Sequence, residues 1–531
     1  MASELTFGSV PAFYRDVYEI VCPNQEHVDH DVFLKLLVKA SLPKNTLSQI
    51  WEIVDNKQGH LSRTGLYKAL ALTALAQQGK AVNEKLLESF SDQELPKPQL
   101  GDLSDLRALS VKVRRERNPN ILGFTYAELT ELDNIKLEIV PEKKGLILKH
   151  VEYELTSRRC KSTVLRRYND FVAFHEVLLL RFPYRMVPAL PPKKLMGADR
   201  DFIEQRRRSL RRFMVLVVRH PVLSDDSIVK YFLTFKGSDL QHRIKDCYKG
   251  TPDEFMTNEN AIKARDIVPL DTQTQFGNSR EQIRALLNSV ARIKDAVERI
   301  SSRASDYASD MLLIGKEMSN IGNQTTPVSA WACGNSETWS YLKRGFKQVA
   351  GEYATLADKA CTQAVREEDQ VGERINLFLD LLQSYQDLCE RHEKGVLTDH
   401  QRALQKMGQY KKKKMQATVN TSAESGAVEQ LEQRILRQES EISNMENRNF
   451  FSLHCVQMET QLIHANLESL HITMENLAAE ESKAHTELAE LWTHLKPAIS
   501  NILPKPDVNG VNSPTRSPTA SPIHNLTDDI I

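Results

Sequence analysis

Three short segments between residues 166 and 206 carry side chains suited to holding a phosphate group. Arg167 directly precedes Tyr168, Lys193 ends a proline-rich stretch, and Arg206 lies early in a basic segment. A dianionic phosphate favours charge-assisted donors, and the planar guanidinium of arginine can donate two parallel hydrogen bonds to it. An Arg-Tyr pair by itself is usually a solvated strand end. The three segments together favour a pocket for a phosphorylated ligand, provided that the fold brings them together.

The elements around these residues predict a small α+β module over residues 131–236. Apolar and polar residues alternate over 135–139 and 151–155, which predicts two half-buried strands joined by a turn at 142–145. A third strand is predicted to end at Tyr168. Such a sheet presents alternate side chains of each strand to opposite faces.

Helices and an extended loop are predicted to follow the strands. Apolar spacing from Phe171 onward indicates a first helix, Asp199 is a suitable N-cap for a long helix to about Arg219, and Ser224 opens a last helix toward Phe235. The loop between the first two helices cannot join a helix or sheet interior because its prolines lack the N–H donor. These prolines are Pro183, Pro188, Pro191 and Pro192.

Three strands, a helix, a proline-rich loop and two helices, in this order, resemble a Phox-homology (PX) domain over its whole length. The resemblance implies that the ligand is phosphatidylinositol 3-phosphate. It implies that Arg167 holds the 3-phosphate, that Tyr168 stacks on the inositol ring, that Lys193 contacts the 1-phosphate and that Arg206 bonds the 4- and 5-hydroxyls. It further implies that the loop tip enters the bilayer through Leu195 and Met196, the alternative being that these two residues pack on the loop itself.

Residues 1–100 are predicted to be helical, with apolar stripes over 32–40, 47–54 and 66–76. Helix, loop and helix in this order, with Trp51 in the second helix, resemble an Eps15-homology (EH) domain, whose core is a pair of EF-hands. In EH domains a tryptophan at this position binds Asn-Pro-Phe peptides. The alternative is that Trp51 is a core residue.

The loop that begins at Asp55 departs from a calcium-binding EF-hand. Such a loop needs oxygen ligands at positions 1, 3, 5 and 12 and a glycine at position 6. Counted from Asp55, Lys57, Gly59 and Leu66 occupy positions 3, 5 and 12. Because three ligands are missing, we expect no metal there.

Residues 280–498 are predicted to form three long helices. Apolar residues recur at spacings of three and four, with breaks at 322–335 and 420–426. A seventh-residue repeat demands partner helices. Following a PX-like module, three such helices resemble a BAR domain, which implies a homodimer that binds curved membrane. The alternative is a plain coiled-coil spacer.

A basic run lies at the end of the second of these helices, with no acidic residue between Asp399 and Glu424. In a BAR domain this position is the distal tip, so the resemblance implies contact with acidic lipid. Each basic residue near an anionic leaflet contributes about 1 kcal/mol. The alternative is a solvated helix face. The run consists of Arg402, Lys406, Lys411, Lys412, Lys413 and Lys414.

Composition excludes several other functions. Lys plus Arg and Asp plus Glu both number 70 in the 531 residues, so no global charge directs the chain to nucleic acid. Seven scattered cysteines without CxxC spacing indicate a reducing cytosol and no zinc site. We expect neither a membrane span nor a secretory signal. Because no nucleotide loop, metal cluster or nucleophile motif appears, we expect no enzymatic activity and no cofactor.

The predicted protein is therefore multidomain and mainly α-helical. Its parts are an EH-like domain (1–100), a linker (101–130), the PX-like domain (131–236), a second linker in which an amphipathic helix is one alternative (237–279), the BAR-like helices (280–498) and a disordered Pro-, Ser- and Asn-rich tail (499–531).

This order of domains is similar to that of the PX-BAR sorting nexins. The resemblance implies a cytoplasmic protein on the cytosolic face of early endosomes that sorts cargo and shapes tubules for endosome-to-Golgi or recycling transport. Two alternatives remain open. One is a PX-targeted coiled-coil scaffold that does not remodel membranes, and the other is an enzyme that uses the PX-like domain only for targeting.

Overall fold

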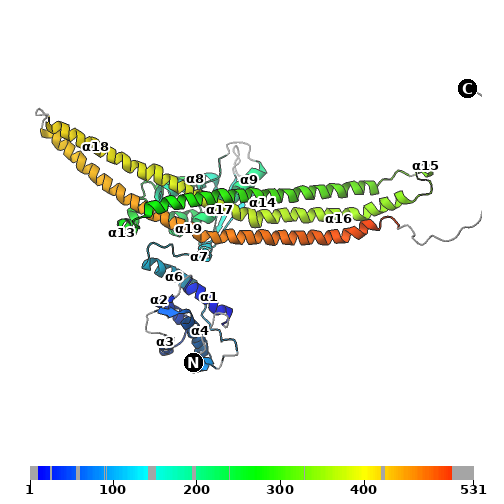
Figure 1. Cartoon of the computed structure of the whole chain (residues 1–531), viewed down its shortest axis with the longest axis horizontal. Coiled ribbons are helices and arrows are strands. Elements are labelled where there is room, and N and C mark those ends of the chain that lie inside the picture. The colour runs from blue at the N-terminus through cyan, green and yellow to red at the C-terminus, as the bar shows by residue number, and fades with distance from the viewer. Residues whose placement is uncertain are drawn as a thin grey trace, which may run out of the picture. The chain divides into compact units, whose positions relative to one another are not determined.

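The computed structural model describes residues 10–23, 27–54, 60–88, 90, 93–141, 151–193, 199–237, 239–327, 329–419 and 425–504 (Figure 1). It divides into two compact units. The first comprises Met1–Ala296 with Gln370–Glu475, and the second comprises Val297–Asp369 with Asn476–Ile531. As predicted, the chain is mainly helical. Among the described residues, no helix has the length and apolar character that crossing a membrane requires.

The N-terminal part of the first unit contains the three predicted helices, one helix that precedes them and a short one that follows. A short antiparallel ribbon pairs His27 with Ser62 and Asp29 with His60, and it joins two helix-strand-helix halves. Asp29 caps the helix that follows it by accepting a hydrogen bond from the Asp31 N–H at 2.8 Å. The elements are α1 (Ala12–Val21), β1 (His27–Asp29), α2 (His30–Val38), α3 (Lys44–Val54), β2 (His60–Ser62), α4 (Arg63–Gln77) and α5 (Glu84–Glu88).

The segment over 101–130, expected to be a solvated tether, is instead largely helical. It forms α6 (Ser104–Arg117) and α7 (Tyr126–Glu131). Leu106 is fully buried in the N-terminal core, and Arg114 and Glu128 form a buried ion pair at 2.7 Å. The expectation rested on the basic residues of α6. It overlooked the apolar side chains between them, which supply the buried stripe that a surface helix needs.

The PX-like module follows the predicted order closely. Its antiparallel sheet has the order β3-β4-β5, with Ile135 opposite Ser157 and Glu152 opposite Arg167. Asp199 caps its helix as predicted, by accepting from the Phe202 N–H at 2.7 Å. The elements are β3 (Ile135–Ile139), β4 (Glu152–Ser157), β5 (Ser162–Arg167), α8 (Tyr168–Arg181), α9 (Arg200–Val218), the 3-10 turn η2 (Leu223–Asp225) and α10 (Ser227–Thr234). The predicted turn at 142–145 lies outside the described residues.

The last of these helices does not begin at Ser224. That residue lies in η2, and the cap is Asp226, whose side chain accepts from the Ile228 N–H at 2.9 Å. The module's core is aromatic, with Phe174 and Phe232 stacked at 4.1 Å between ring centroids. A further helix, α11 (Leu240–Cys247), lies in the expected second linker and packs on this core. Two short helices follow it, α12 (Glu254–Thr257) and α13 (Ala264–Ile267).

The long helices differ from the prediction mainly in the second one. Its course is interrupted by two π-helical segments, η3 (Glu368–Gly372) and η4 (His392–Leu397), which a count of apolar spacings does not reveal. Each π-turn holds an extra residue and so shifts the phase of the apolar stripe. The elements are α14 (Thr272–Gly322), α15 (Ala330–Cys333), α16 (Thr338–Glu367), α17 (Glu373–Arg391), α18 (Thr398–Val419) and α19 (Ser425–Ser500).

In the second unit, α14, α16 and α19 lie side by side (Figure 1) around Val349, Leu356 and Leu495. Close approach of α14 to α16 depends on Gly315. A Cβ atom there would lie 2.9 Å from the Ala350 carbonyl oxygen, so a larger residue would push the helices apart. The tail beyond residue 504 lies outside the described residues.

Candidate phosphoinositide site

The two arginines that end β5 have opposite surroundings because successive residues of a strand face opposite sides of the sheet. Arg166 is 1% exposed, and its Nε and Nη2 donate to the Phe232 carbonyl while Nη2 also donates to the Phe235 carbonyl at 2.8 Å. Burial lowers the pKa of Arg166 to about 10. Arg166 therefore ties β5 to the end of α10 and cannot reach a ligand.

Arg167 faces outward, with 48% of its side chain exposed. Its Nε and Nη2 donate to Glu152 Oε1 at 3.1 and 2.9 Å, from the directly opposite position on β4. Its backbone N–H donates to Asp170 at 2.7 Å, which holds the start of α8. Glu152 thus orients the guanidinium, and the outer part of the group stays open to solvent.

Tyr168 and Arg206 meet beside the proline-rich loop. The Arg206 guanidinium carbon lies 4.6 Å from the centre of the Tyr168 ring, a cation–π contact. The Tyr168 hydroxyl donates to the Pro191 carbonyl, and Arg206 Nη2 donates weakly to the Pro192 carbonyl at 3.5 Å. Lys193 is exposed at the next position of the loop. The predicted loop-tip contacts, Leu195 and Met196, lie outside the described residues.

Three other arginines of α9 have acidic partners. Arg207 and Arg208 pair with Glu204 on the same helix, and Arg212 pairs with Glu373 and Asp380 on α17. Of the arginines from 206 to 212, Arg206 is the one that contacts Tyr168 and the loop.

A buried polar cluster that sequence reasoning missed fastens the PX-like module to α19. Arg185 donates to Glu254 at 2.7 Å and to Glu459 at 3.2 Å, and Glu459 also accepts from His220 Nε2 at 2.9 Å. His220 Nδ1 accepts backbone N–H groups of Val222 and Leu223, so its proton lies on Nε2. Although burial raises the pKa of Glu459, His220 and Arg185 hold it below its usual value.

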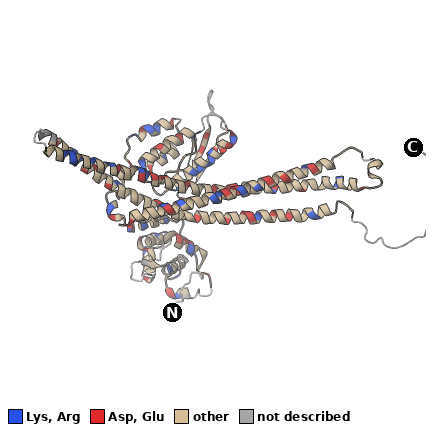
Figure 2. Cartoon of the chain, turned by 45° about the horizontal axis from the view of Figure 1, so that its top comes forward, with Lys and Arg blue, Asp and Glu red and all other residues tan. Residues whose placement is uncertain are grey.

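The basic run on α18 is partly neutralised by α19. Lys411 lies 3.7 Å from Glu439 and Lys414 lies 2.7 Å from Glu432. Lys412 and Lys413 are exposed and, within the described part of the chain, form no ion pair. Figure 2 shows acidic and basic residues interspersed along the long helices.

Arg402 and Lys406, which precede this run, also have local contacts. Arg402 pairs with Asp399 at 3.0 Å, and the Lys406 ammonium lies 5.8 Å from the Tyr410 ring centre. A scan for acid-free stretches missed the partners in α19 because they come from the next helix.

Trp51, the predicted peptide-binding residue, is half-buried. Its ring packs against Phe33 at 5.4 Å and against His30 at 4.8 Å. Peptide binding there stays a prediction. The loop over 55–59 lies outside the described residues, and within the described ranges no cluster of His, Cys, Asp or Glu could hold a metal ion.

Comparisons with known proteins agree with this architecture. A family model described as "PX domain" matches residues 154–236, and one described as "Sorting nexin 8/Mvp1 BAR domain" matches residues 251–505. The chain is 50% identical to sorting nexin-8 of Mus musculus, covering 79% of this chain and 91% of the relative. It is 50% identical to sorting nexin-8 of Homo sapiens, with coverage of 78% and 90%. It is 28% identical to sorting nexin MVP1 of Kluyveromyces lactis, with coverage of 64% and 67%.

Among solved structures, the cryo-EM structure of the SNX-BAR Mvp1 tetramer matches with a TM-score of 0.54 at 22% identity. The match covers 68% of this chain and 99% of that chain, and it supports the fold.

A PX module followed by BAR helices defines a class of membrane-binding trafficking adaptors, which are not enzymes. The PX domain implies phosphoinositide binding, and the BAR domain implies dimerisation and membrane binding. The chain belongs to the sorting nexin 8 family of PX-BAR sorting nexins.

Proposed function

We propose that this chain is a peripheral membrane protein that binds phosphatidylinositol 3-phosphate on the cytosolic face of early endosomes. As a homodimer, it senses or generates curvature for cargo sorting and for endosome-to-Golgi or recycling transport. The observation that carries the proposal is the gathering of Tyr168, Arg206 and the Pro191 and Pro192 carbonyls, with Lys193 next on the loop.

The proposed roles follow from the chemistry of each group. Arg167, already oriented by Glu152, donates to the 3-phosphate, and the Tyr168 ring supports the inositol face. Lys193 supplies a mobile ammonium for the 1-phosphate. Arg206, held over Tyr168, donates to the 4- and 5-hydroxyls. A phosphate at either hydroxyl would need room beside Arg206, and this disfavours more highly phosphorylated lipids.

Sedimentation with liposomes tests the lipid assignment. Full-length protein is mixed with vesicles that contain either phosphatidylinositol, its 3-phosphate, its 4-phosphate or its 4,5-bisphosphate at matched total charge. We expect the protein to sediment preferentially with the 3-phosphate, and the Arg167→Ala variant to lose this preference. Equal binding to all charge-matched vesicles would contradict a specific headgroup pocket.

The alternative function is a PX-targeted coiled-coil scaffold without remodelling activity. The acidic and basic residues interspersed along the described parts of the long helices favour it (Figure 2). Electron microscopy of liposomes that contain phosphatidylinositol 3-phosphate separates the two functions. Tubules supported by the purified protein favour the sorting nexin function, whereas bound protein on undeformed vesicles favours the scaffold.

A further inference from the structure

A cleft of about 820 Å³ lies within the first unit, where α6 and the segment after it meet the PX-like module, α13 and α19. Cavities of about 300–1,000 Å³ are typical of sites for small ligands. The four proposed phosphoinositide contacts are not among the residues that line this cleft. The cleft is therefore a candidate site for a second ligand.

Hydrogen bonds from the segment after α6 hold the walls of the cleft together. The Asn120 side chain donates to the Ile267 carbonyl at 2.9 Å, which joins this segment to the end of α13. Gln461 of α19 accepts from the Leu122 N–H at 2.6 Å and donates to the Asn120 carbonyl at 2.8 Å. These bonds make the cleft a preformed feature of the unit, as ligand pockets usually are.

Much of the lining is apolar. Three half-buried side chains come from the segment after α6, and two buried ones come from α19. They are Ile121, Leu122, Phe124, Met458 and Leu462. Such walls favour a ligand with an apolar body, because binding removes that body from water.

Two cations of the lining are available to a ligand. Arg115 of α6 and Lys263, which directly precedes α13, are both exposed, and within the described ranges neither forms an ion pair. Although solvent reaches the Arg115 side chain, burial by the walls of the cleft lowers its pKa, and the nearby Arg185 guanidinium lowers it further. A guanidinium that faces another cation favours an anionic ligand.

The acids of the lining are mostly engaged with other partners. They are Glu116, Asp225, Glu259 and Glu459. Glu116 pairs with Lys112 at 3.6 Å, Asp225 with Arg159 at 2.5 Å, and Glu459 with Arg185 at 3.2 Å. Among the described residues, the exposed Glu259 is the one lining acid without an ion pair. The unpaired charges of the cleft therefore favour an anion.

His454 adds a buried polar atom that has no partner. Its side chain lines the cleft from α19 and is 5% exposed, and within the described part of the chain its Nδ1 forms no hydrogen bond. Burial lowers the pKa of His454 to about 4, so the ring is neutral at neutral pH. A neutral imidazole can carry its proton on Nδ1 and donate it. Because buried polar groups without partners are unfavourable, a ligand oxygen at this position would be stabilising.

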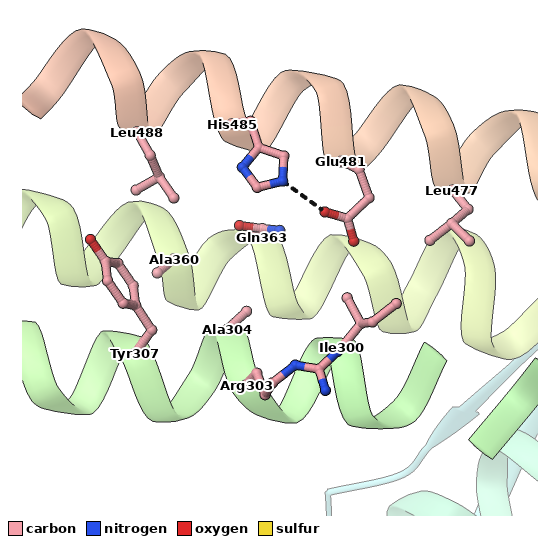
Figure 3. A pocket seen from close by; sticks show the side chains of 10 residues that line it. All are labelled: Ile300, Arg303, Ala304, Tyr307, Ala360, Gln363, Leu477, Glu481, His485 and Leu488. Atoms are coloured by element: carbon pink, nitrogen blue, oxygen red, sulfur yellow. Dashed lines mark ion pairs between the residues drawn. The ribbon is translucent and has the colours of Figure 1, made fainter. Parts of the chain in front are cut away.

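The groove of about 440 Å³ in the second unit, between α14, α16 and α19, lacks this arrangement (Figure 3). Its lining has one arginine, Arg303, and one acid, Glu481, which is ion-paired with His485 at 3.6 Å. No excess of Lys and Arg over acids in that lining selects an anion. The cleft of the first unit differs in having two unpaired cations beside a buried donor.

We propose that the cleft binds a phosphate monoester carried on an apolar chain. Arg115, Lys263 and His454 hold the phosphate, and the chain lies against the apolar lining. A guanidinium fork, an ammonium and an imidazole N–H supply donors for the three terminal oxygens of a monoester. Free phosphate shares this chemistry, but it would leave the apolar walls uncovered. The site is additional to the proposed phosphoinositide pocket and does not depend on it.

Isothermal titration calorimetry of the full-length protein tests the proposal with three probes. They are octyl phosphate, inorganic phosphate and octyl glucoside, with the two amphiphiles kept below the concentrations at which they form micelles. We expect octyl phosphate to bind at least about tenfold more tightly than either other probe. The reason is that inorganic phosphate lacks the apolar chain and octyl glucoside lacks the charge.

Single substitutions locate the bound probe. Arg115→Gln and Lys263→Gln should each weaken octyl phosphate binding at least about tenfold. Arg265→Gln is the matched control, because it removes the same charge from an exposed residue of α13 that does not line the cleft. This control and Arg167→Ala should bind octyl phosphate as wild type does, and circular dichroism should show every variant to be folded.

Three results would overturn the proposal. The first is that octyl phosphate does not bind, or binds no better than inorganic phosphate or octyl glucoside. The second is that Arg167→Ala abolishes binding while Arg115→Gln does not, which means that the probe enters the phosphoinositide pocket. The third is that the control loses as much affinity as the two cleft variants. The proposed endosomal function is unaffected by any of these results, because liposome sedimentation tests it separately.

Discussion

Single residues of β5 show how strand alternation assigns different roles to neighbours of the same type. Arg166 is enclosed by carbonyl groups, and Arg167 is half-exposed beside Glu152. We expect Arg167→Ala to lose at least about 2 kcal/mol of binding to liposomes that contain phosphatidylinositol 3-phosphate. Its thermal midpoint should fall less than that of Arg166→Ala, because Arg167 is half-exposed and Arg166 is enclosed, although the substitution also removes the partner of the buried Glu152 carboxylate.

Arg166→Ala is the matched comparison and should behave in the opposite way. It leaves the carbonyls of Phe232 and Phe235 without their donor inside the fold, at a cost of about 3 kcal/mol of unfolding free energy. Thermal denaturation of both variants, followed by liposome sedimentation of the folded fraction, separates the two roles. An Arg167→Ala protein that loses as much stability as Arg166→Ala, or one that still binds, would contradict the assignment.

A second prediction at this scale concerns His392, which is 1% exposed. Burial lowers its pKa from 6.5 to about 4. Because the folded protein resists protonation, the contribution of His392 to stability is complete above pH 6.5 and is lost as the pH falls toward 4. For one such group, the unfolding free energy changes by about 1.4 kcal/mol per pH unit between the two pKa values.

The substitution His392→Asn should flatten the dependence of unfolding free energy on pH between 6.5 and 4, even if the variant is less stable at neutral pH. Asn keeps a group that can bond Ser452, which lies 2.8 Å from His392 Nδ1. His464→Asn, at an exposed position of α19, should keep the wild-type slope. Urea denaturation at a series of pH values gives the unfolding free energy of the two variants. If this free energy depends equally on pH in both, the prediction is refuted.

Local patterns predicted the secondary-structure elements that position Arg167, Tyr168 and Arg206, and the physical reason is that strand alternation, helix capping and proline geometry act over a few residues. Asp199 as a cap and the strand over 135–139 are examples. Local patterns could not reveal the cluster around Arg185, because Glu459 is 274 positions away and the two groups meet only after folding.

At the scale of elements, the apolar stripe of α16 contains a buried polar side chain, Glu367, which a search for apolar spacing does not detect. Glu367 has a raised pKa, with burial as the largest cause. Its favourable contribution is therefore present below its unfolded pKa of 4.5 and is lost as the pH rises through the folded pKa. Glu367 therefore contributes less to the stability of the folded unit at neutral pH than at acid pH.

Glu367→Gln should consequently stabilise the protein at pH 7 by about 1 kcal/mol, or about 2–4 °C in thermal midpoint. The gain should shrink as the pH falls toward 4.5, where the wild-type carboxyl is protonated. Glu352→Gln, at an exposed position of the same helix, should have no such effect. Differential scanning calorimetry at pH 5 and pH 7 measures both variants. A Glu367→Gln protein that is less stable at pH 7 would mean that the carboxylate has a partner.

Element boundaries were hardest to predict where charge and apolar spacing compete. The basic residues of α6 suggested a tether, yet its apolar residues pack on the N-terminal core. The π-turns η3 and η4 were invisible because each changes the helical phase by a single residue, within the tolerance of any spacing count.

At the scale of the whole molecule, membrane attachment is expected to combine several weak contacts. Two PX domains of a dimer and a basic tip make later contacts intramolecular, which can raise avidity by about 10²–10⁴. At the tip, Lys411 and Lys414 are paired with acids of α19, whereas Lys412 and Lys413 are exposed. We therefore expect the central pair to be the part of the run that faces lipid.

The double reversal of Lys412 and Lys413 to Glu should weaken binding to acidic liposomes strongly and leave the affinity for a soluble inositol 1,3-bisphosphate unchanged, because the headgroup pocket is elsewhere in the fold. The loss should diminish as salt rises, since exposed charges are screened within about 8 Å at physiological ionic strength. Reversal of Lys411 and Lys414 makes the same charge change and also breaks the pairs with Glu439 and Glu432, so it should additionally lower the stability of the α18–α19 end. Liposome sedimentation across a salt series measures membrane binding, and isothermal titration calorimetry measures the affinity for the soluble headgroup. Thermal denaturation measures stability. If both double variants bind and tubulate liposomes as well as wild type at low salt, the run is a solvated helix end, and attachment depends on the phosphoinositide pocket.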